Sequence, residues 1–141
     1  MNLSGIFIQL LIGSAVIAVI VGIHAELLNL LSVNFPRLMA LARRHLRRFA
    51  NTGVIIAAML FILFAHTVEV WIWALVLLGV GAVQGLEPAL YFALVSFSTV
   101  GFGDITLTQD WRLLSALIAA NGFLLFGWST AYMVELVRRT A

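Results

Sequence analysis

Residues 96–104 carry the most distinctive chemistry of this chain. They read Ser-Phe-Ser-Thr-Val-Gly-Phe-Gly-Asp, so two glycines flank one aromatic residue after a Thr-Val pair. Glycine permits the positive φ that turns successive carbonyl groups toward one side of the backbone. Carbonyls aligned in this way, together with a hydroxyl, can replace the water shell of a cation. The atoms concerned are the carbonyl oxygens of Thr99, Val100, Gly101 and Phe102 and the hydroxyl of Thr99.

His66 and Glu69 form a second group whose spacing suggests chemistry. They lie three residues apart in a long apolar stretch, so a helix places them on one face, about one turn apart. Ionisable side chains inside a membrane span are costly, and each is by default a functional hypothesis. We expect a buried polar network that braces the neighbouring short helix. Its predicted members are His66, Glu69, Ser96, Ser98 and Asn121.

Two other interpretations of His66 and Glu69 remain open. A histidine with a perturbed environment can titrate near neutral pH, so a proton-sensing gate is one of them. A metal site is the other. His24 and Glu26, on an earlier amphipathic stretch, are expected to extend toward a surface rather than to act.

The composition identifies the environment of these groups as a membrane. Of the 141 residues, 63% are hydrophobic and only 10% are charged, and the mean hydropathy is +1.11. A soluble domain of this size could not keep so much apolar surface from water. The chain contains no cysteine, which excludes disulfides and thiolate metal sites. No nucleophile–base pair stands out either, so we expect no enzyme and no cofactor.

Three apolar stretches are long enough to cross a bilayer, which takes about 20 helical residues. They are residues 3–23, 51–86 and 113–134. The first lacks the basic n-region and cleavage site of a signal peptide, so we interpret it as a permanent helix. The helix that leads into residue 35 is expected to break or restart at Pro36. Glu87 and Pro88 favour the start of a short helix, because proline suits the first turn and an acid there faces the positive end of the dipole.

The arginines predict one topology. All eight basic residues are arginine, and five of them lie between Arg37 and Arg48. Cytoplasmic loops carry an excess of basic residues, so this segment and Arg138-Arg139 are placed inside. The N-terminus is then outside, the C-terminus is cytoplasmic, and residues 86–112 open to the outside. The same cluster lies between membrane spans, so we expect no binding of nucleic acid.

Residues 88–104, Pro-Ala-Leu-Tyr-Phe-Ala-Leu-Val-Ser-Phe-Ser-Thr-Val-Gly-Phe-Gly-Asp, resemble the pore helix and signature filter of the tetrameric potassium channels. The resemblance extends through both flanking helices, from about residue 51 to the C-terminus, and it does not cover residues 1–35. Gly122 falls where that family's inner helix has its hinge glycine. The residues that match the ion-binding filter are Thr99, Val100, Gly101, Phe102 and Gly103.

The resemblance implies a fold and a domain organisation. The expected fold is an all-α membrane protein with three spanning helices and a re-entrant pore helix per subunit, assembled as a homotetramer. Residues 1–35 are expected to form an N-terminal transmembrane helix with an amphipathic extension, and residues 36–50 a basic cytoplasmic or interfacial segment. The pore module then covers residues 51–141: an outer helix 51–86, a pore helix 88–98, a filter 99–104 and an inner helix 112–137.

The implied function is passive, potassium-selective conduction in the inner (plasma) membrane, with K⁺ bound at residues 99–102 and the lipid bilayer as surroundings. Three departures bear on selectivity. Phe102 stands where that family more commonly has a tyrosine, and Phe92 stands where it often has a tryptophan that hydrogen-bonds this tyrosine. Val95 stands where some bacterial members have an acid behind the filter. Tyr91 replaces a second tryptophan, so we expect its hydroxyl to bond Asp104 at the filter mouth. A weakly selective cation channel and a non-conducting membrane scaffold or accessory subunit are the alternatives.

Overall fold

The computed structural model describes residues 3–140 of the protein. This part of the chain is built from helices, as the all-α prediction requires. The elements in chain order are α1 (Leu3–Leu46), the 3-10 helix η1 (Arg47–Phe49), α2 (Ala50–Gly79), α3 (Leu86–Phe97) and α4 (Arg112–Thr140).

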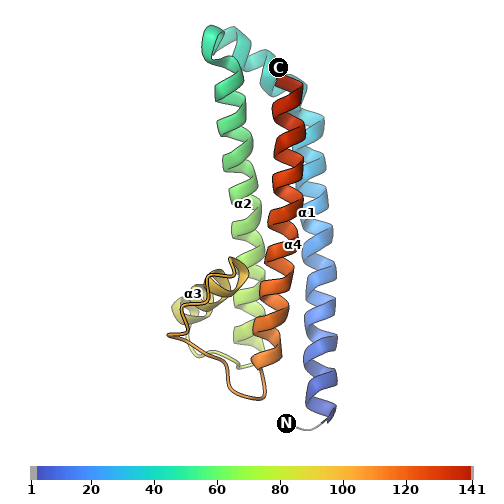
Figure 1. Cartoon of the computed structure of the whole chain (residues 1–141), viewed down its shortest axis with the longest axis vertical. Helices are drawn as coiled ribbons and strands as arrows, with labels where there is room; N and C mark the ends of the chain where they lie inside the picture. The colour runs from blue at the N-terminus through green and yellow to red at the C-terminus, as the bar shows by residue number, and fades with distance from the viewer. Residues whose placement is uncertain (1–2, 141) are drawn as a thin grey trace.

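The three long helices α1, α2 and α4 run side by side along the length of the molecule (Figure 1). η1 joins α1 to α2 at one end, so these two helices are antiparallel, and the C-terminus lies at the same end. The short helix α3 projects from the other half of the bundle, where it packs against α2 and α4. The loop that follows α3 therefore lies on the side of the bundle that α3 occupies.

α1 runs through Pro36 without interruption, so the prediction that Pro36 breaks the helix is wrong. The physical reason is a buried stripe that continues on both sides of the proline. Its members follow one another at spacings of three or four residues, as one face of a helix requires. They are Leu28, Leu31, Phe35, Met39 and Ala42. Packing of this stripe against α2 and α4 outweighs the one hydrogen bond that the proline removes.

The predicted boundary between residues 35 and 36 falls inside the continuous α1, and the division into a spanning and an interfacial segment stays a prediction. The 44 residues of α1 make a helix of about 66 Å, roughly twice the thickness of a hydrocarbon core. Residues 36–46 belong to the same continuous helix, and the last part of α1 turns across the end of the bundle toward α2 (Figure 1). Arg43 and Arg44 stand in its last turn, where positive charge complements the helix dipole.

α2 ends at Gly79, seven residues before the predicted end at residue 86. Gly81 and Gly85 adopt φ values of +69° and +91°, which turn the chain out of the helix and into α3. α3 starts and ends within two residues of the predicted helix 88–98, and it has Pro88 and Glu87 in its first turn. α4 continues three residues beyond the predicted end at residue 137.

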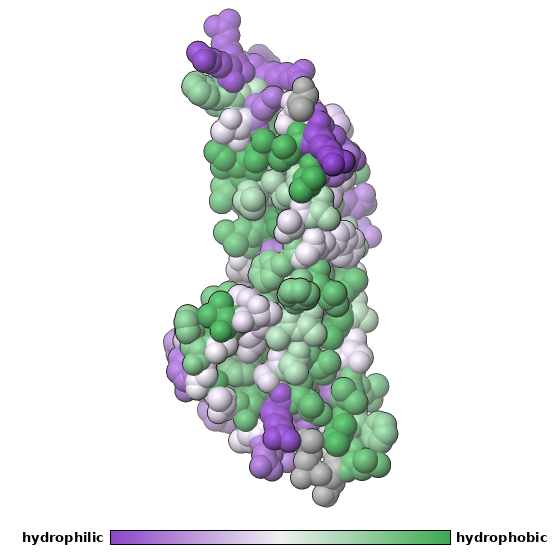
Figure 2. Space-filling model, in the orientation of Figure 1, coloured by the Kyte–Doolittle hydropathy of each residue, from purple (hydrophilic) through white to green (hydrophobic). Residues whose placement is uncertain are grey.

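The surface of the bundle is largely apolar. Two stretches of the described chain are long and apolar enough to cross a membrane, residues 3–79 and Arg112–Thr140. The first of them is folded back on itself at η1. Figure 2 shows hydrophilic residues gathered at the end of the molecule where η1 lies, and apolar residues over much of the shaft of the helices. This surface agrees with a membrane protein.

The core around α3 fixes its position on the bundle. One cluster of side chains that are at most 1% exposed joins the three helices. It contains Trp73 of α2, Phe97 of α3, and Leu114, Ile118 and Leu125 of α4. Because these side chains hold α3 against α2 and α4, they fix the position of its C-terminal end, and of the loop that follows, relative to the bundle.

Candidate functional site

The loop after α3 has an alternating backbone. Thr99, Gly101 and Gly103 adopt positive φ values of 60°, 56° and 77°, whereas Val100 and Phe102 between them do not. Positive φ is uncommon for a β-branched residue such as threonine, and strained backbone of this kind clusters at functional sites. The loop therefore has a special conformation at Thr99 as well as at the two glycines, and the sequence pointed only to the glycines.

The amide groups and the carbonyl groups of this loop have different partners. The N–H groups of Ser98, Thr99, Val100 and Gly101 donate to the last carbonyls of α3 at 2.9–3.3 Å. They thereby satisfy carbonyl groups that a helix end otherwise leaves open. Among residues 3–140, no hydrogen bond is accepted by the carbonyls of residues 99–103. All of these residues are exposed in the single chain, so five successive carbonyl groups are free to bind another partner.

Tyr91 and Asp104 are joined at the far end of the loop. The hydroxyl of Tyr91 donates to Oδ2 of Asp104 at 2.7 Å, the pair that the sequence analysis brought together. This hydrogen bond lowers the pKa of Asp104 below its ordinary value of 3.8. It also raises the pKa of Tyr91 above its ordinary value of 10.0. Both groups are at the surface, and the bond connects the loop to α3.

The two phenylalanines near the loop lie in different surroundings. Phe92 is 6% exposed and belongs to the core cluster around α3. Phe102 is 71% exposed in the single chain. Val95 and Ser96 line a cavity of about 340 Å³ behind the loop, together with Tyr91 and Phe92.

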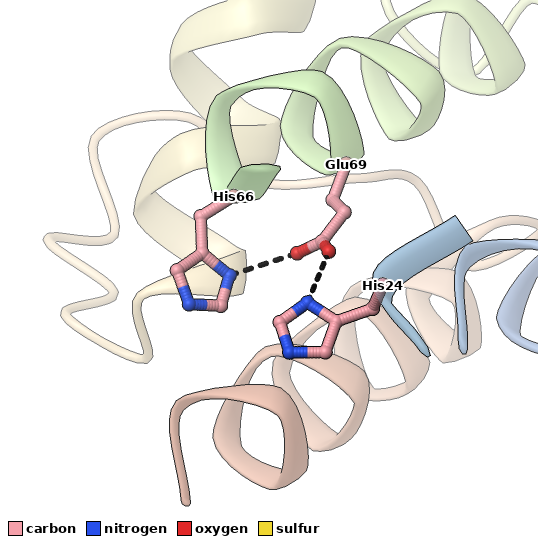
Figure 3. Close-up of side chains that lie close together, drawn as sticks. All are labelled: His24, His66 and Glu69. Atoms are coloured by element: carbon pink, nitrogen blue, oxygen red, sulfur yellow. Dashed lines mark hydrogen bonds and ion pairs between the residues drawn. The ribbon is translucent and has the colours of Figure 1, made fainter. Parts of the chain in front are cut away.

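His66 and Glu69 meet a third ionisable residue, His24 of α1. Nδ1 of His24 lies 2.6 Å from Oε1 of Glu69, and Nδ1 of His66 lies 2.8 Å from Oε2. Figure 3 shows both imidazoles directed at one carboxylate, which bridges α1 and α2. His24 and Glu69 are fully buried, and His66 is 6% exposed. The expectation that His24 extends toward a surface was wrong.

Ser129 of α4 closes these residues into a ring. Its Oγ lies 3.2 Å from Nε2 of His24 and 3.1 Å from Nε2 of His66. The ring therefore contains four hydrogen bonds, and each of them needs one proton. Ser129 supplies one, so the two imidazoles and the carboxylate share three. Three protons leave the ring neutral, either as one imidazolium beside a carboxylate or as two neutral imidazoles beside a carboxylic acid.

The predicted network is thus partly different in the structure. His66 and Glu69 are together, but the other three predicted members lie elsewhere. Asn121 accepts a hydrogen bond from Nε1 of Trp73 at 3.0 Å, and the hydroxyl of Ser98 donates to the carbonyl of Val95 in the last turn of α3. The contact of the ring with α3 is an aromatic one, between His66 and Phe97, with ring centroids 5.9 Å apart.

Sequence reasoning missed His24 and Ser129 as members of the ring. One signal could have found His24: it lies four residues from Ile20 and four from Leu28, so it shares the apolar face of α1 that is buried. Ser129 gives no comparable signal, because serine is common at packed positions of membrane helices.

Gly122 lies where the C-terminal end of α3 contacts α4. A Cβ atom at this position would overlap the carbonyl oxygen of Phe97 and would lie 2.7 Å from its carbonyl carbon. The absence of a side chain therefore allows the C-terminal end of α3 to rest on α4. This gives Gly122 a packing role, and its predicted role as a hinge stays a prediction.

Comparison with known proteins identifies the family. A family model described as an ion channel matches residues 52–139, which include α3, the loop after it and nearly all of α2 and α4. No curated protein and no solved structure matches the chain. Because the matched segment covers more than half of the sequence, this chain belongs to the ion channel family.

Proposed function

We propose that this protein is a potassium-selective channel of the plasma membrane, in which four copies of the chain surround one pathway. Each subunit crosses the membrane three times, through α1, α2 and α4. α3 enters the membrane from the outside and returns through the loop. Membership of the ion channel family favours transport over catalysis.

The observation that carries this proposal is the row of carbonyl groups at residues 99–103 that accept no hydrogen bond from the described part of the chain. Unpaired backbone at membrane depth persists only where it is buried in protein or lines water. Positive φ at every second residue supports a common direction for these carbonyls. We infer that Thr99, Val100, Gly101, Phe102 and Gly103 form the filter and that K⁺ binds at the first four of them.

One strand of carbonyls cannot surround an ion, which is why the proposal requires several copies. Residues 99–104 are exposed in the single chain and are available for such an assembly. α3 ends directly before the filter, so the negative end of its dipole is directed toward the ion. Conduction is passive, because ions move between neighbouring carbonyl cages by mutual displacement. Gly122 is a candidate hinge of α4.

A weakly selective cation channel is the second candidate. It is favoured by Phe102, because a phenyl ring has no hydroxyl with which to hold the filter rigid. In the described residues, hydrogen bonds from backbone N–H groups connect the start of the filter to α3, and the Tyr91–Asp104 hydrogen bond connects its end. Selectivity must then depend on these two attachments.

The test is ion flux in liposomes that contain the purified protein. We expect K⁺ flux well above Na⁺ flux and block by barium. Gly101→Ala places a side chain at φ +56° and should abolish K⁺ flux. Gly22→Ala is the matched control, because this helical glycine has open space around it, and it should conduct like the wild type.

Each outcome decides between the candidates. Equal fluxes of K⁺ and Na⁺ would overturn selectivity and favour the weakly selective channel. Absence of flux in folded, reconstituted protein would overturn conduction and leave the scaffold. Chemical cross-linking of the same sample should give species up to the tetramer, and a dimer as the largest species would contradict the assembly.

A further inference from the structure

The ring of His24, Glu69, His66 and Ser129 has a use that ion conduction does not require. We propose that His24, His66 and Glu69 bind one divalent transition-metal ion of the zinc type, at the junction of α1 and α2. The three ligands come from a single chain. The proposal therefore stands or falls independently of the proposed potassium conduction.

The ligand atoms have the right types, and small side-chain movements bring them to the separations that an ion requires. One nitrogen of each imidazole and one carboxylate oxygen lie within 4.8 Å of one another. Zinc binds imidazole nitrogen and carboxylate oxygen at about 2.0–2.2 Å, so neighbouring ligands of a tetrahedral ion are about 3.3 Å apart. The Nδ1–oxygen distances are 2.6 and 2.8 Å. One ion bound to all three residues thus requires each Nδ1–oxygen pair to separate by about half an ångström. Ligand atoms that are up to 4.8 Å apart must also approach one another to about 3.3 Å.

Ser129 is placed to orient both imidazoles for this role. When Nδ1 binds a metal, the neutral imidazole carries its proton on Nε2. Both Nε2 atoms lie 3.1–3.2 Å from Oγ of Ser129, and a hydroxyl oxygen can accept two hydrogen bonds. Ligating histidines generally donate their second N–H to such a partner, which fixes ring and tautomer. One hydroxyl of α4 performs this task for both ligands.

The proton and charge balance of the site is simple. Without an ion, the two imidazoles and the carboxylate share three protons and the ring is neutral. With the ion, only the two Nε2 protons remain, so one proton is released and the occupied site has a net charge of +1. Imidazole and carboxylate ligands suit Zn²⁺, Co²⁺ and Ni²⁺ rather than Mg²⁺ or Ca²⁺. Three protein ligands leave a fourth position for water or an anion.

Access to the ring is provided from the side of His66. A cavity of about 380 Å³ lies between α2 and α4, and its lining includes His66 and Ser129. Two soft sulfur atoms, from Met59 and Met133, are in the same lining. His24 and Glu69 have no exposed surface, so an ion reaches them past the His66 ring. Once bound, it holds α1 to α2 and positions the hydroxyl of α4.

Co²⁺ is a suitable probe, because its visible absorption reports the number of ligands. We expect purified full-length protein, freed of metal by a chelator, to bind one Co²⁺ per chain with the intense bands of four-coordinate cobalt. Zn²⁺ should displace it and should raise the thermal midpoint of unfolding. His24→Gln and His66→Gln should each weaken binding by at least 100-fold. Ser129→Ala retains all three ligands and should weaken it about 10-fold.

His45→Gln is the matched control, because His45 is the one other histidine of the chain and is exposed on the last turn of α1. It should bind Co²⁺ like the wild type. The proposal is overturned if wild-type protein shows no stoichiometric four-coordinate Co²⁺, or if binding survives in folded His66→Gln protein. A loss of binding in His45→Gln would also overturn it. Should a histidine variant fail to fold, the wild-type stoichiometry and spectrum still decide.

Discussion

Ser129 contributes a single hydroxyl to two buried imidazoles, and its removal leaves both Nε2 atoms without this partner. An unsatisfied buried polar group costs about 1–3 kcal/mol. We therefore expect Ser129→Ala to lower the free energy of unfolding by about that amount in metal-free protein. Thermal or denaturant unfolding in detergent measures the change.

Thr130→Ala is the control for this substitution, because it removes a hydroxyl from the next residue. Thr130 is exposed, and its hydroxyl bonds to the carbonyl of Phe126 in its own helix. A change within about 0.5 kcal/mol is expected. Equal effects of the two substitutions would contradict the role of the Ser129 hydroxyl in the ring.

The hydrogen bond between Tyr91 and Asp104 makes the stability of the folded protein depend on pH, and its direction follows from the two pKa shifts. The bond favours the ionised carboxylate and lowers the pKa of Asp104. The stability that the Asp104 carboxylate contributes is fully present above its ordinary pKa of 3.8. It is lost as pH falls through the lower pKa that Asp104 has in the folded protein. The pKa of Tyr91 is raised, so the stability that its protonated hydroxyl contributes is present below pH 10.0. It is lost as pH rises through the higher pKa that Tyr91 has in the folded protein.

Tyr91→Phe tests this pair. The substitution should raise the pKa of Asp104 toward its ordinary value, because it removes the hydroxyl donor. The carboxyl signals of ¹³C-labelled aspartate measure this directly, since the chain contains only Asp104 and Asp110, and the latter serves as an internal reference. An Asp104 titration that is the same in both proteins would show that the bond is absent in solution.

At the scale of elements, Gly122 determines how closely α3 approaches α4. A methyl group there would overlap the Phe97 carbonyl, and backbone cannot yield as a flexible side chain does. Overpacking of this kind costs about 1–3 kcal/mol, so Gly122→Ala should destabilise the protein and shift α3 together with the loop. Unfolding experiments and the Tyr91–Asp104 titration report the two effects separately.

Gly127→Ala is the matched control in the same helix, because nothing lies within 4 Å of a Cβ at Gly127. Alanine in a helix is favoured over glycine by about 1 kcal/mol, so this variant should be as stable as the wild type or more stable. If Gly122→Ala were equally well tolerated, close packing of α3 on α4 could not be the reason for the glycine.

The elements also show what sequence could and could not predict. Local signals were sufficient for α3, because Glu87 and Pro88 favour a helix start and both lie in its first turn. They failed at Pro36, because the buried stripe of α1 obtains its stability from packing against α2 and α4. The same limit applies to the ring. His66 and Glu69 are neighbours on one helix, whereas His24 is 45 residues from Glu69 and reaches it only through the α1–α2 contact.

At the scale of the whole molecule, α1 is attached to α4 along its length. Near one end, Oε1 of Gln9 accepts a hydrogen bond from the backbone N–H of Leu113 in the first turn of α4 at 3.0 Å. Farther along, Ser32 and Tyr132 are bonded at 2.7 Å. The ring lies between these two attachments. The N-terminal helix, which the resemblance to potassium channels did not cover, is therefore part of the same bundle as α2 and α4.

The orientation of this bundle can be tested because the chain contains no cysteine, so a single introduced thiol reports one position. Seven of the eight arginines lie toward the end of the bundle with η1 and the C-terminal end of α4, whereas Arg112 begins α4 at the other end. Cytoplasmic segments are rich in basic residues. We expect an impermeant maleimide to label Ser4→Cys and Thr106→Cys in right-side-out vesicles, and Phe49→Cys only after permeabilisation. All three residues are exposed, and none of the substitutions removes an arginine. Labelling of Ser4→Cys and Phe49→Cys from the same side would eliminate the α1 crossing. The reversed pattern at all three positions would place the filter mouth, and Asp104 with it, in the cytoplasm.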